Sequence, residues 1–201
     1  MTDLSRLLKA YDEQLRTDAE TPSAVSVTLL GPLRLVTFLG GRGFVTYRDL
    51  GGADEAGVRE LVDGVTLRRV TEEPDVRAMC AMQDEVFGSP VSDRTANAIL
   101  RRQAIDPSME LWVAEADGQI VTAGRLEPVP GTDFAGIWGG STRTEWGGRG
   151  IYRALTAARA RSALAQGKSL INSDSTEYSR PILERYGFAR VSTTTPYVWE
   201  R

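Results

Sequence analysis

The sequence of 201 residues contains no histidine and a single cysteine, Cys80. Without imidazole, Ser-His-Asp and Cys-His nucleophilic sites are excluded, and so are the usual zinc sites. One cysteine also excludes an intramolecular disulfide and a cysteine cluster that binds metal. Proton transfer is therefore left to carboxylates, tyrosine, lysine, the thiol or ordered water. Cys80 lies between Met79 and Met82 in an apolar pattern, and we expect it to be a buried small hydrophobe.

The sequence also lacks a hydrophobic run of the length that a membrane span or a signal peptide requires. Residues 1–16 instead alternate charged and apolar side chains. The formal net charge of −3 argues against a broadly basic surface of the kind that binds nucleic acid. We therefore expect a cytoplasmic protein that has no nucleic-acid partner, no membrane partner and no bound metal.

Two parts are predicted along the chain. Residues 1–64 predict a helix over 3–20, a three-strand antiparallel meander over 24–30, 33–39 and 43–50, and a short helix over 51–62. We expect this α+β unit to pack on the second part, 65–201, or on another subunit, and a homodimer is left open. The sequence GGRG occurs at 40–43 and again at 147–150, which leaves a degenerate half-domain open.

The second part has the element order of a mixed α/β domain. It predicts a strand over 65–70, helices near 75–87 and 92–104, and three successive strands over 111–116, 120–128 and 134–142. A helix to 165, a strand over 169–174, a helix over 177–186 and two terminal strands near 189–194 and 197–200 follow. This order favours a mixed, mostly antiparallel sheet with flanking helices.

The stretch TEWGGRGIYRAL, residues 144–155, places three glycines and an arginine directly before a helical run. A helix start leaves backbone N–H groups unpaired and favours an anion. Without side chains at Gly147, Gly148 and Gly150, and with the cation of Arg149, a pyrophosphate fits across the amides of 148–152. The stretch matches neither a Walker loop nor a Rossmann fingerprint. The alternative is a glycine-rich turn without a ligand.

The preceding strand carries Gly139 and Gly140 in its middle. Glycine is unfavourable there unless the strand has a bulge or another group approaches its backbone. A strand with free edge groups pairs with an extended ligand, and an amide chain that ends in a pyrophosphate has the shape of coenzyme A. On the helix that follows, the arginines either assist a phosphate or form a solvated basic face; they are Arg153, Arg159 and Arg161.

These residues resemble the GNAT superfamily of acyl-CoA-dependent N-acetyltransferases over about 65–201. The family's signature, Arg/Gln-x-x-Gly-x-Gly/Ala, corresponds to GGRGIY, from Gly147 to Tyr152. Gly147 departs from the expected Arg or Gln, and Tyr152 departs from the expected small residue, so its ring has the size to cover the phosphate cradle. The later SRPILERYGF, with Gly187-Phe188 after the last helix, also resembles the family.

The resemblance implies that the two central strands splay apart beyond Gly140 and about Asn172, and that acetyl-CoA binds there as co-substrate. The residues that it assigns to the cofactor are Gly140, Ser141, Thr142, Gly147, Gly148, Arg149, Gly150, Ile151, Tyr152, Ser175 and Ser179. The asparagine and tyrosine of many members correspond to Thr176 and Leu183, so the usual tyrosine acid is absent. Ser179 either donates a hydrogen bond to the leaving thiolate or packs against the cofactor.

By the same resemblance, an amine attacks the thioester directly while a base removes its proton. The carboxylates in the expected region are Glu127 and Asp133, which are either the base or exposed hairpin charges. Arg125 either pairs with an acidic substrate group or is solvated. The resemblance thus implies an N-acetyltransferase that acts on a primary amine of a small molecule or protein. The alternatives are a regulatory module that binds CoA without catalysis and a structural dimerisation protein.

Overall fold

The computed structural model describes residues 4–11, 13–14, 26–30, 33–37, 43–49 and 64–194, with side chains at 4–11, 13–14 and 64–191. Its contacts divide the chain into two compact units. Unit 1 comprises Met1–Asp49, Gly131–Asp133 and Asn172–Arg201, and unit 2 comprises Leu50–Pro130 and Phe134–Ile171. The expected division of the chain between 64 and 65 stays a prediction.

Unit 2 contains an antiparallel sheet whose four strands pair in chain order. They are β4 (Val65–Val70), β5 (Glu110–Ala116), β6 (Gln119–Pro128) and β7 (Phe134–Thr142). Asp117 and Gly118 form the turn between β5 and β6, and both have positive φ, as a two-residue hairpin turn with the sheet's twist requires. These four strands and the hairpin confirm the predicted order.

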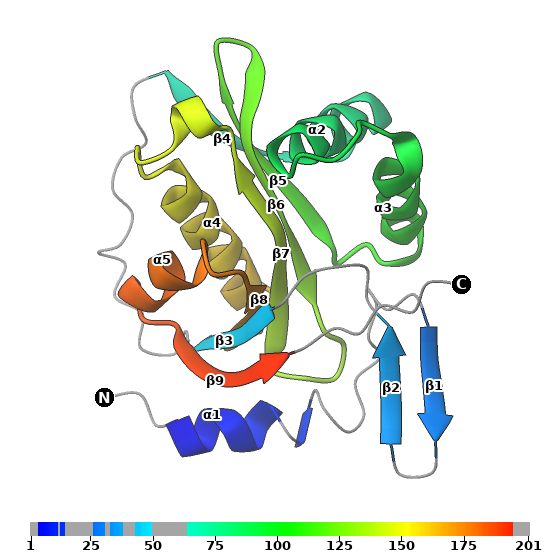
Figure 1. The fold of residues 1–201 in the computed structure, drawn as a ribbon, viewed down its shortest axis with the longest axis vertical. Coiled ribbons are helices and arrows are strands. Elements are labelled where there is room, and N and C mark those ends of the chain that lie inside the picture. The colour runs from blue at the N-terminus through cyan, green and yellow to red at the C-terminus, as the bar shows by residue number, and fades with distance from the viewer. Residues whose placement is uncertain are drawn as a thin grey trace. The chain divides into compact units, whose positions relative to one another are not determined.

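Helices cover both faces of this sheet. Figure 1 shows α2 (Glu73–Val86) and α3 (Asp93–Ile105) on one side and α4 (Ile151–Ala165) on the other. Alternate strand residues serve the two layers: Leu111 and Val113 pack with α2 and α3, whereas Ala114 packs with Ile151 of α4. Each fully buried aliphatic side chain of this kind contributes about 1.5–3 kcal/mol. The mixed α/β class and the mostly antiparallel sheet are therefore as predicted.

Unit 1 contains shorter elements. They are α1 (Leu4–Tyr11), β1 (Ser26–Leu30), β2 (Leu33–Thr37), β3 (Gly43–Asp49), α5 (Arg180–Arg185) and β9 (Ala189–Thr194), and β8 (Leu170–Ser175) enters it from unit 2. β1 pairs with β2, but β3 pairs with β9, also antiparallel. The predicted three-strand meander is therefore wrong, because local strand propensity identifies a strand without specifying its partner.

Several element ends differ from the prediction. α1 ends at Tyr11, and the rest of the predicted 3–20 helix lies largely outside the described residues. α5 begins at Arg180 rather than 177, because Pro181 suits only a first helical turn. The predicted helix over 51–62 and strand over 197–200 lie outside the described residues. The splay of the two central strands stays a prediction.

Candidate functional site

The two glycines of β7 form a bulge. The pairing of β6 with β7 shifts between Ala123 and Arg125, so that Gly139 and Gly140 lie opposite Gly124. Gly139 has φ +59, a conformation that costs a residue with a side chain about 1–2 kcal/mol. Its carbonyl accepts a hydrogen bond of 2.5 Å from Gln83 Nε2 of α2. The sequence left open a bulge or a close approach to the backbone at these glycines, and the pairing of the strands shows the bulge.

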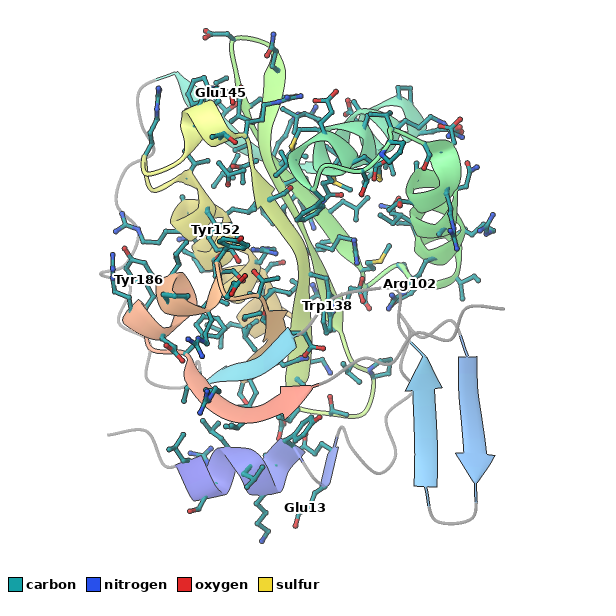
Figure 2. The ribbon with its side chains drawn as sticks, in the orientation of Figure 1. Glu13, Arg102, Trp138, Glu145, Tyr152 and Tyr186 are labelled. Atoms are coloured by element: carbon teal, nitrogen blue, oxygen red, sulfur yellow. The ribbon has the colours of Figure 1, made fainter. Side chains whose placement is uncertain are left out.

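The group that approaches the backbone at Gly140 is the chain's own tyrosine. A Cβ built at Gly140 would lie 2.6 Å from Cε2 and 3.0 Å from the hydroxyl of Tyr152, so only glycine fits beneath the ring. Figure 2 shows Tyr152 on the α4 side of the sheet. The ring thus covers the main chain that the sequence assigned to an extended ligand.

The next two residues of β7, Ser141 and Thr142, differ in whether their hydroxyl groups have a hydrogen-bond partner. The Thr142 hydroxyl accepts a hydrogen bond of 2.7 Å from the Thr122 hydroxyl of β6. The Ser141 side chain is buried, and its Oγ has no hydrogen-bond partner among the residues whose side chains are described. An unpaired buried hydroxyl costs about 1–3 kcal/mol, which makes Ser141 a candidate for contact with a bound molecule.

The start of α4 presents backbone donors to solvent. Gly148 and Gly150 have φ +73 and +80, and Gly150 directly precedes the helix. Gly147 N–H is bonded to Thr144 O at 3.0 Å, but within the described part of the chain the N–H groups of 148–152 donate to no other residue. Residues 147–150 are exposed. Free donors and the helix dipole together form an anion-binding geometry.

Two side chains flank this helix start. Arg149 stacks on Trp146 of the preceding 3-10 helix, η3 (Thr144–Trp146), with its guanidinium carbon 4.6 Å from the ring centroid. The contact keeps a cation beside the exposed amides. Ile151 points the other way, into the core with Ala114 and Val121, so only its N–H is available to an anion.

Arg159 is buried, and both sequence interpretations of it are wrong. Only 1% of its surface is exposed, so it neither assists a phosphate at the surface nor belongs to a solvated face. Its guanidinium donates to Arg125 O at 3.2 Å, to Leu155 O and to the Thr156 hydroxyl. Burial lowers the pKa of Arg159, and Tyr152 partly offsets this by charge and a hydrogen bond.

The arrangement around Arg159 explains a glycine in the neighbouring strand. A Cβ at Gly124 of β6 would lie 2.5 Å from Arg159 Nη1. Gly124 thus makes room for Arg159, as Gly140 does for Tyr152. Sequence reasoning missed the pairing of Gly124 with Arg159, although a glycine in the middle of a strand was a signal for it.

Glu127, a predicted base, is buried on β6 with 3% of its side chain exposed. Its Oε2 pairs with Arg102 Nη1 at 2.9 Å and its Oε1 with Arg125 Nε at 3.0 Å. Arg102 lies in the last turn of α3, where Figure 2 shows it on the other side of the sheet from Tyr152. The alternative of an exposed hairpin charge is therefore wrong for Glu127.

Asp133, the other predicted base, is exposed and belongs to unit 1. Its Oδ2 accepts a hydrogen bond of 3.0 Å from Gln14 Nε2, and its backbone N–H donates to Gln14 Oε1 at 2.8 Å. The carboxylate is therefore oriented by one side chain within its own unit.

Ser179 and Thr176, also in unit 1, bond to each other before α5. Ser179 Oγ accepts from Thr176 N–H at 3.1 Å and lies 3.3 Å from the Thr176 hydroxyl. Ser175 is buried, and its hydroxyl donates to that of Ser173 at 3.3 Å. Leu183, which the resemblance aligns with a tyrosine of many members, is 1% exposed and belongs to the core.

We expect Ser179→Ala to lower the free energy of unfolding by about 0.5–1 kcal/mol, because Thr176 N–H loses its side-chain acceptor. Urea unfolding monitored by tryptophan fluorescence measures this. Ser92→Ala is the matched control, since Ser92 precedes α3 without a side-chain cap bond. An equal loss in both variants, or none in Ser179→Ala, contradicts the bonding role.

Cys80 takes no part in nucleophilic chemistry. It is 1% exposed, and burial raises the pKa of its thiol to about 11, so the thiol is protonated at neutral pH. The predicted buried hydrophobe is confirmed.

The β7 bulge, the α4 start and Glu127 belong to unit 2, whereas Asp133, Ser175 and Ser179 belong to unit 1. Among the residues with described side chains, no group of three or more Cys, Asp or Glu is placed to hold a metal ion. No helix within the described ranges has both the length and the apolar character to cross a membrane.

Comparisons with known proteins identify the class. A family profile described as "Acetyltransferase (GNAT) domain" matches residues 75–197, which is more than half of the chain. The chain therefore belongs to the GNAT acetyltransferase family. No curated protein matches the sequence.

Solved structures share the fold. A GCN5-related N-acetyltransferase from Sphaerobacter thermophilus is 24% identical with a TM-score of 0.59, over 76% of this chain and 49% of that one. A tandem GNAT protein from the clavulanic acid biosynthesis pathway is 16% identical with a TM-score of 0.58, over 76% and 51%. A GCN5-related N-acetyltransferase from Ralstonia eutropha JMP134 is 21% identical with a TM-score of 0.56, over 67% and 99%. The chain spans about half the length of the first two.

Proposed function

We propose that the chain is an acyl-CoA-dependent N-acyltransferase that transfers an acetyl group from acetyl-CoA to a primary amine of a small molecule or protein. One observation carries the proposal. At the start of α4, after the exposed residues 147–150, the N–H groups of 148–152 have no partner among the described residues, and Gly148 and Gly150 have no Cβ. A pyrophosphate is the anion that such a cradle suits. Membership of the GNAT family supports acetyl-CoA as its source.

In the proposed reaction, the neutral amine attacks the thioester carbonyl, the C–N bond forms and the C–S bond breaks. The amine proton passes to Glu127 or Asp133. Each carboxylate oxygen of Glu127 is already paired with one arginine and keeps one further lone pair, which can accept a hydrogen bond from a water molecule. Glu127 would therefore receive the proton through that water. The Ser179 hydroxyl or solvent supplies a proton to the leaving thiolate. No metal takes part in this scheme, and we propose a cytoplasmic location.

Binding and turnover test the proposal in sequence. Calorimetry with acetyl-CoA at low salt should give a saturable isotherm, and a panel of primary amines should then yield free CoA and acetylated product in equal amounts. Absence of acetyl-CoA binding would remove the proposal. Slow hydrolysis of the thioester without any acetylated amine would favour the second candidate.

The second candidate is a module that binds CoA without turnover. Two observations favour it: the ring of Tyr152 covers Gly140, and Leu183 stands buried where the family has its tyrosine acid. A ligand arm that pairs with β7 at Gly140 requires the ring to move. The free energy of that movement would be subtracted from the free energy of binding.

We therefore expect Tyr152→Ala to bind acetyl-CoA about 10-fold more tightly than the natural chain, because no ring has to leave Gly140. Tyr152→Phe is the matched control, since it keeps the ring and loses only the hydroxyl. Calorimetric Kd values for the three proteins decide the point. Equal affinities would mean that the ring and the ligand do not compete.

A further inference from the structure

Arg125 has a guanidinium that the protein fixes but does not fully use. Its Nε is paired with Glu127 at 3.0 Å, which sets the orientation of the planar group. Its Nη1 and Nη2 donate to no residue among those whose side chains are described. The side chain is 19% exposed, so it is largely shielded but part of it reaches solvent. A planar fork with free donors matches a carboxylate.

The charges around Arg125 leave an excess. Two guanidinium groups, of Arg102 and Arg125, surround the single carboxylate of Glu127, which gives one net positive charge (+2 − 1 = +1). Glu127 is 97% shielded from solvent, so this cluster is screened far less than a surface pair. One bound monoanion would neutralise the net charge of this cluster.

The free donors lie at the β7 bulge. A Cβ at Gly139 would lie 3.0 Å from Arg125 Nη1 and 2.9 Å from Gln83 Nε2, so both side chains border the bulge. Ser141, which pairs with Ala123 across the strands, shares the face of Ala123 and Arg125. Its buried hydroxyl, unpaired among the described residues, therefore lies on the same side of the sheet.

This face is opposite the one that carries Tyr152 and Arg159. Gly124 contacts Arg159 of α4, and the neighbouring Arg125 points to the other side, towards α2. The phosphate cradle is at the start of α4. An anion that binds to Arg125 therefore belongs to the acceptor amine and not to the phosphates of acetyl-CoA.

We propose that Arg125, held by Glu127, binds a carboxylate on the acceptor, so that the acceptors are amines that carry a carboxylate, such as amino acids or acidic peptides. This inference rests on the proposed function and names its substrate class. Glu127 is the positioning residue for Arg125, and the Ser141 hydroxyl is a further donor to the bound carboxylate.

Matched pairs of amino acids and their amides test the inference on the full chain. With CoA bound, calorimetry should show amino acids binding at least about 10-fold more tightly than the corresponding amides. In acetyl transfer, Arg125→Gln should raise KM for the amino acids at least about 30-fold, with a smaller change in kcat and little change for the amides. Arg101→Gln on α3, an exposed arginine, is the matched control.

The outcomes separate the two proposals. Transfer to amines without preference for a carboxylate overturns the inference and leaves the N-acyltransferase in place. Tighter binding of phosphoethanolamine than of any amino acid contradicts the proposal that Arg125 binds a carboxylate. Loss of all transfer with acetyl-CoA still bound removes the proposed function, and the binding comparison then still decides for or against Arg125. If Arg125→Gln fails to fold, Arg125→Lys keeps a cation beside Glu127 but lacks the planar fork, and it gives the same comparison.

Discussion

Gly150→Glu is expected to weaken acetyl-CoA binding at least about 100-fold, a loss of about 2.7 kcal/mol. The substitution places a carboxylate at the exposed helix start, where the N–H groups of 148–152 have no partner among the described residues. The carboxylate would repel a pyrophosphate and compete for the same donors. Because φ at position 150 is +80, the side chain also adds about 1–2 kcal/mol of backbone strain. Calorimetric titration with acetyl-CoA measures the loss.

Gly167→Glu separates charge at the cradle from strain in the helix. Gly167 follows the other end of α4, has φ +75 and has no atom within 4 Å of a built Cβ. It therefore takes the same charge and similar strain without approaching 148–152. We expect its affinity for acetyl-CoA to be unchanged. An equal loss in the two variants, or normal binding by Gly150→Glu, would place the phosphates elsewhere.

The order of elements from 65 to 194 was predictable because each element carries a local pattern. Asp117-Gly118 determines a hairpin, Pro74 suits a helix start, and alternate apolar residues determine the strands. The partner of β3 was not predictable, because its pairing with β9 joins segments about 150 residues apart, and no local pattern encodes that distance.

The candidate site was predictable to the extent that it depends on glycine. The glycines of β7 indicated a bulge or a close approach to the backbone, and the glycines before α4 indicated a helix start with free N–H groups. The positions of Arg159 and Glu127 did not follow. The sequence interpretations placed Arg159 at the surface and left Glu127 as either a base or an exposed charge. The structure buries both, Arg159 against carbonyls and a hydroxyl and Glu127 between two arginines. A pattern of single residues does not reveal which partners tertiary packing supplies.

Gly124→Ala is expected to lower the free energy of unfolding by about 3 kcal/mol, more than a surface substitution would. The new methyl group would lie 2.5 Å from Arg159 Nη1 and 2.9 Å from its Cζ. Although an arginine side chain is flexible, this one is 1% exposed and is held by Arg125 O, Leu155 O and the Thr156 hydroxyl. Displacing it breaks hydrogen bonds of a charged group that has no solvent to replace them. Urea unfolding followed by the fluorescence of the four tryptophans measures the change.

A double-mutant cycle attributes the loss to Arg159. In an Arg159→Met background the guanidinium is absent, so Gly124→Ala should cost less than about 1 kcal/mol, which gives a coupling of about 2 kcal/mol between the two positions. The coupling would show that glycine is required at position 124 because the buried guanidinium of Arg159 packs against β6 there. The same cost in both backgrounds would instead mean that the alanine strains β6 itself, and Arg159 would then have no part in the requirement for glycine.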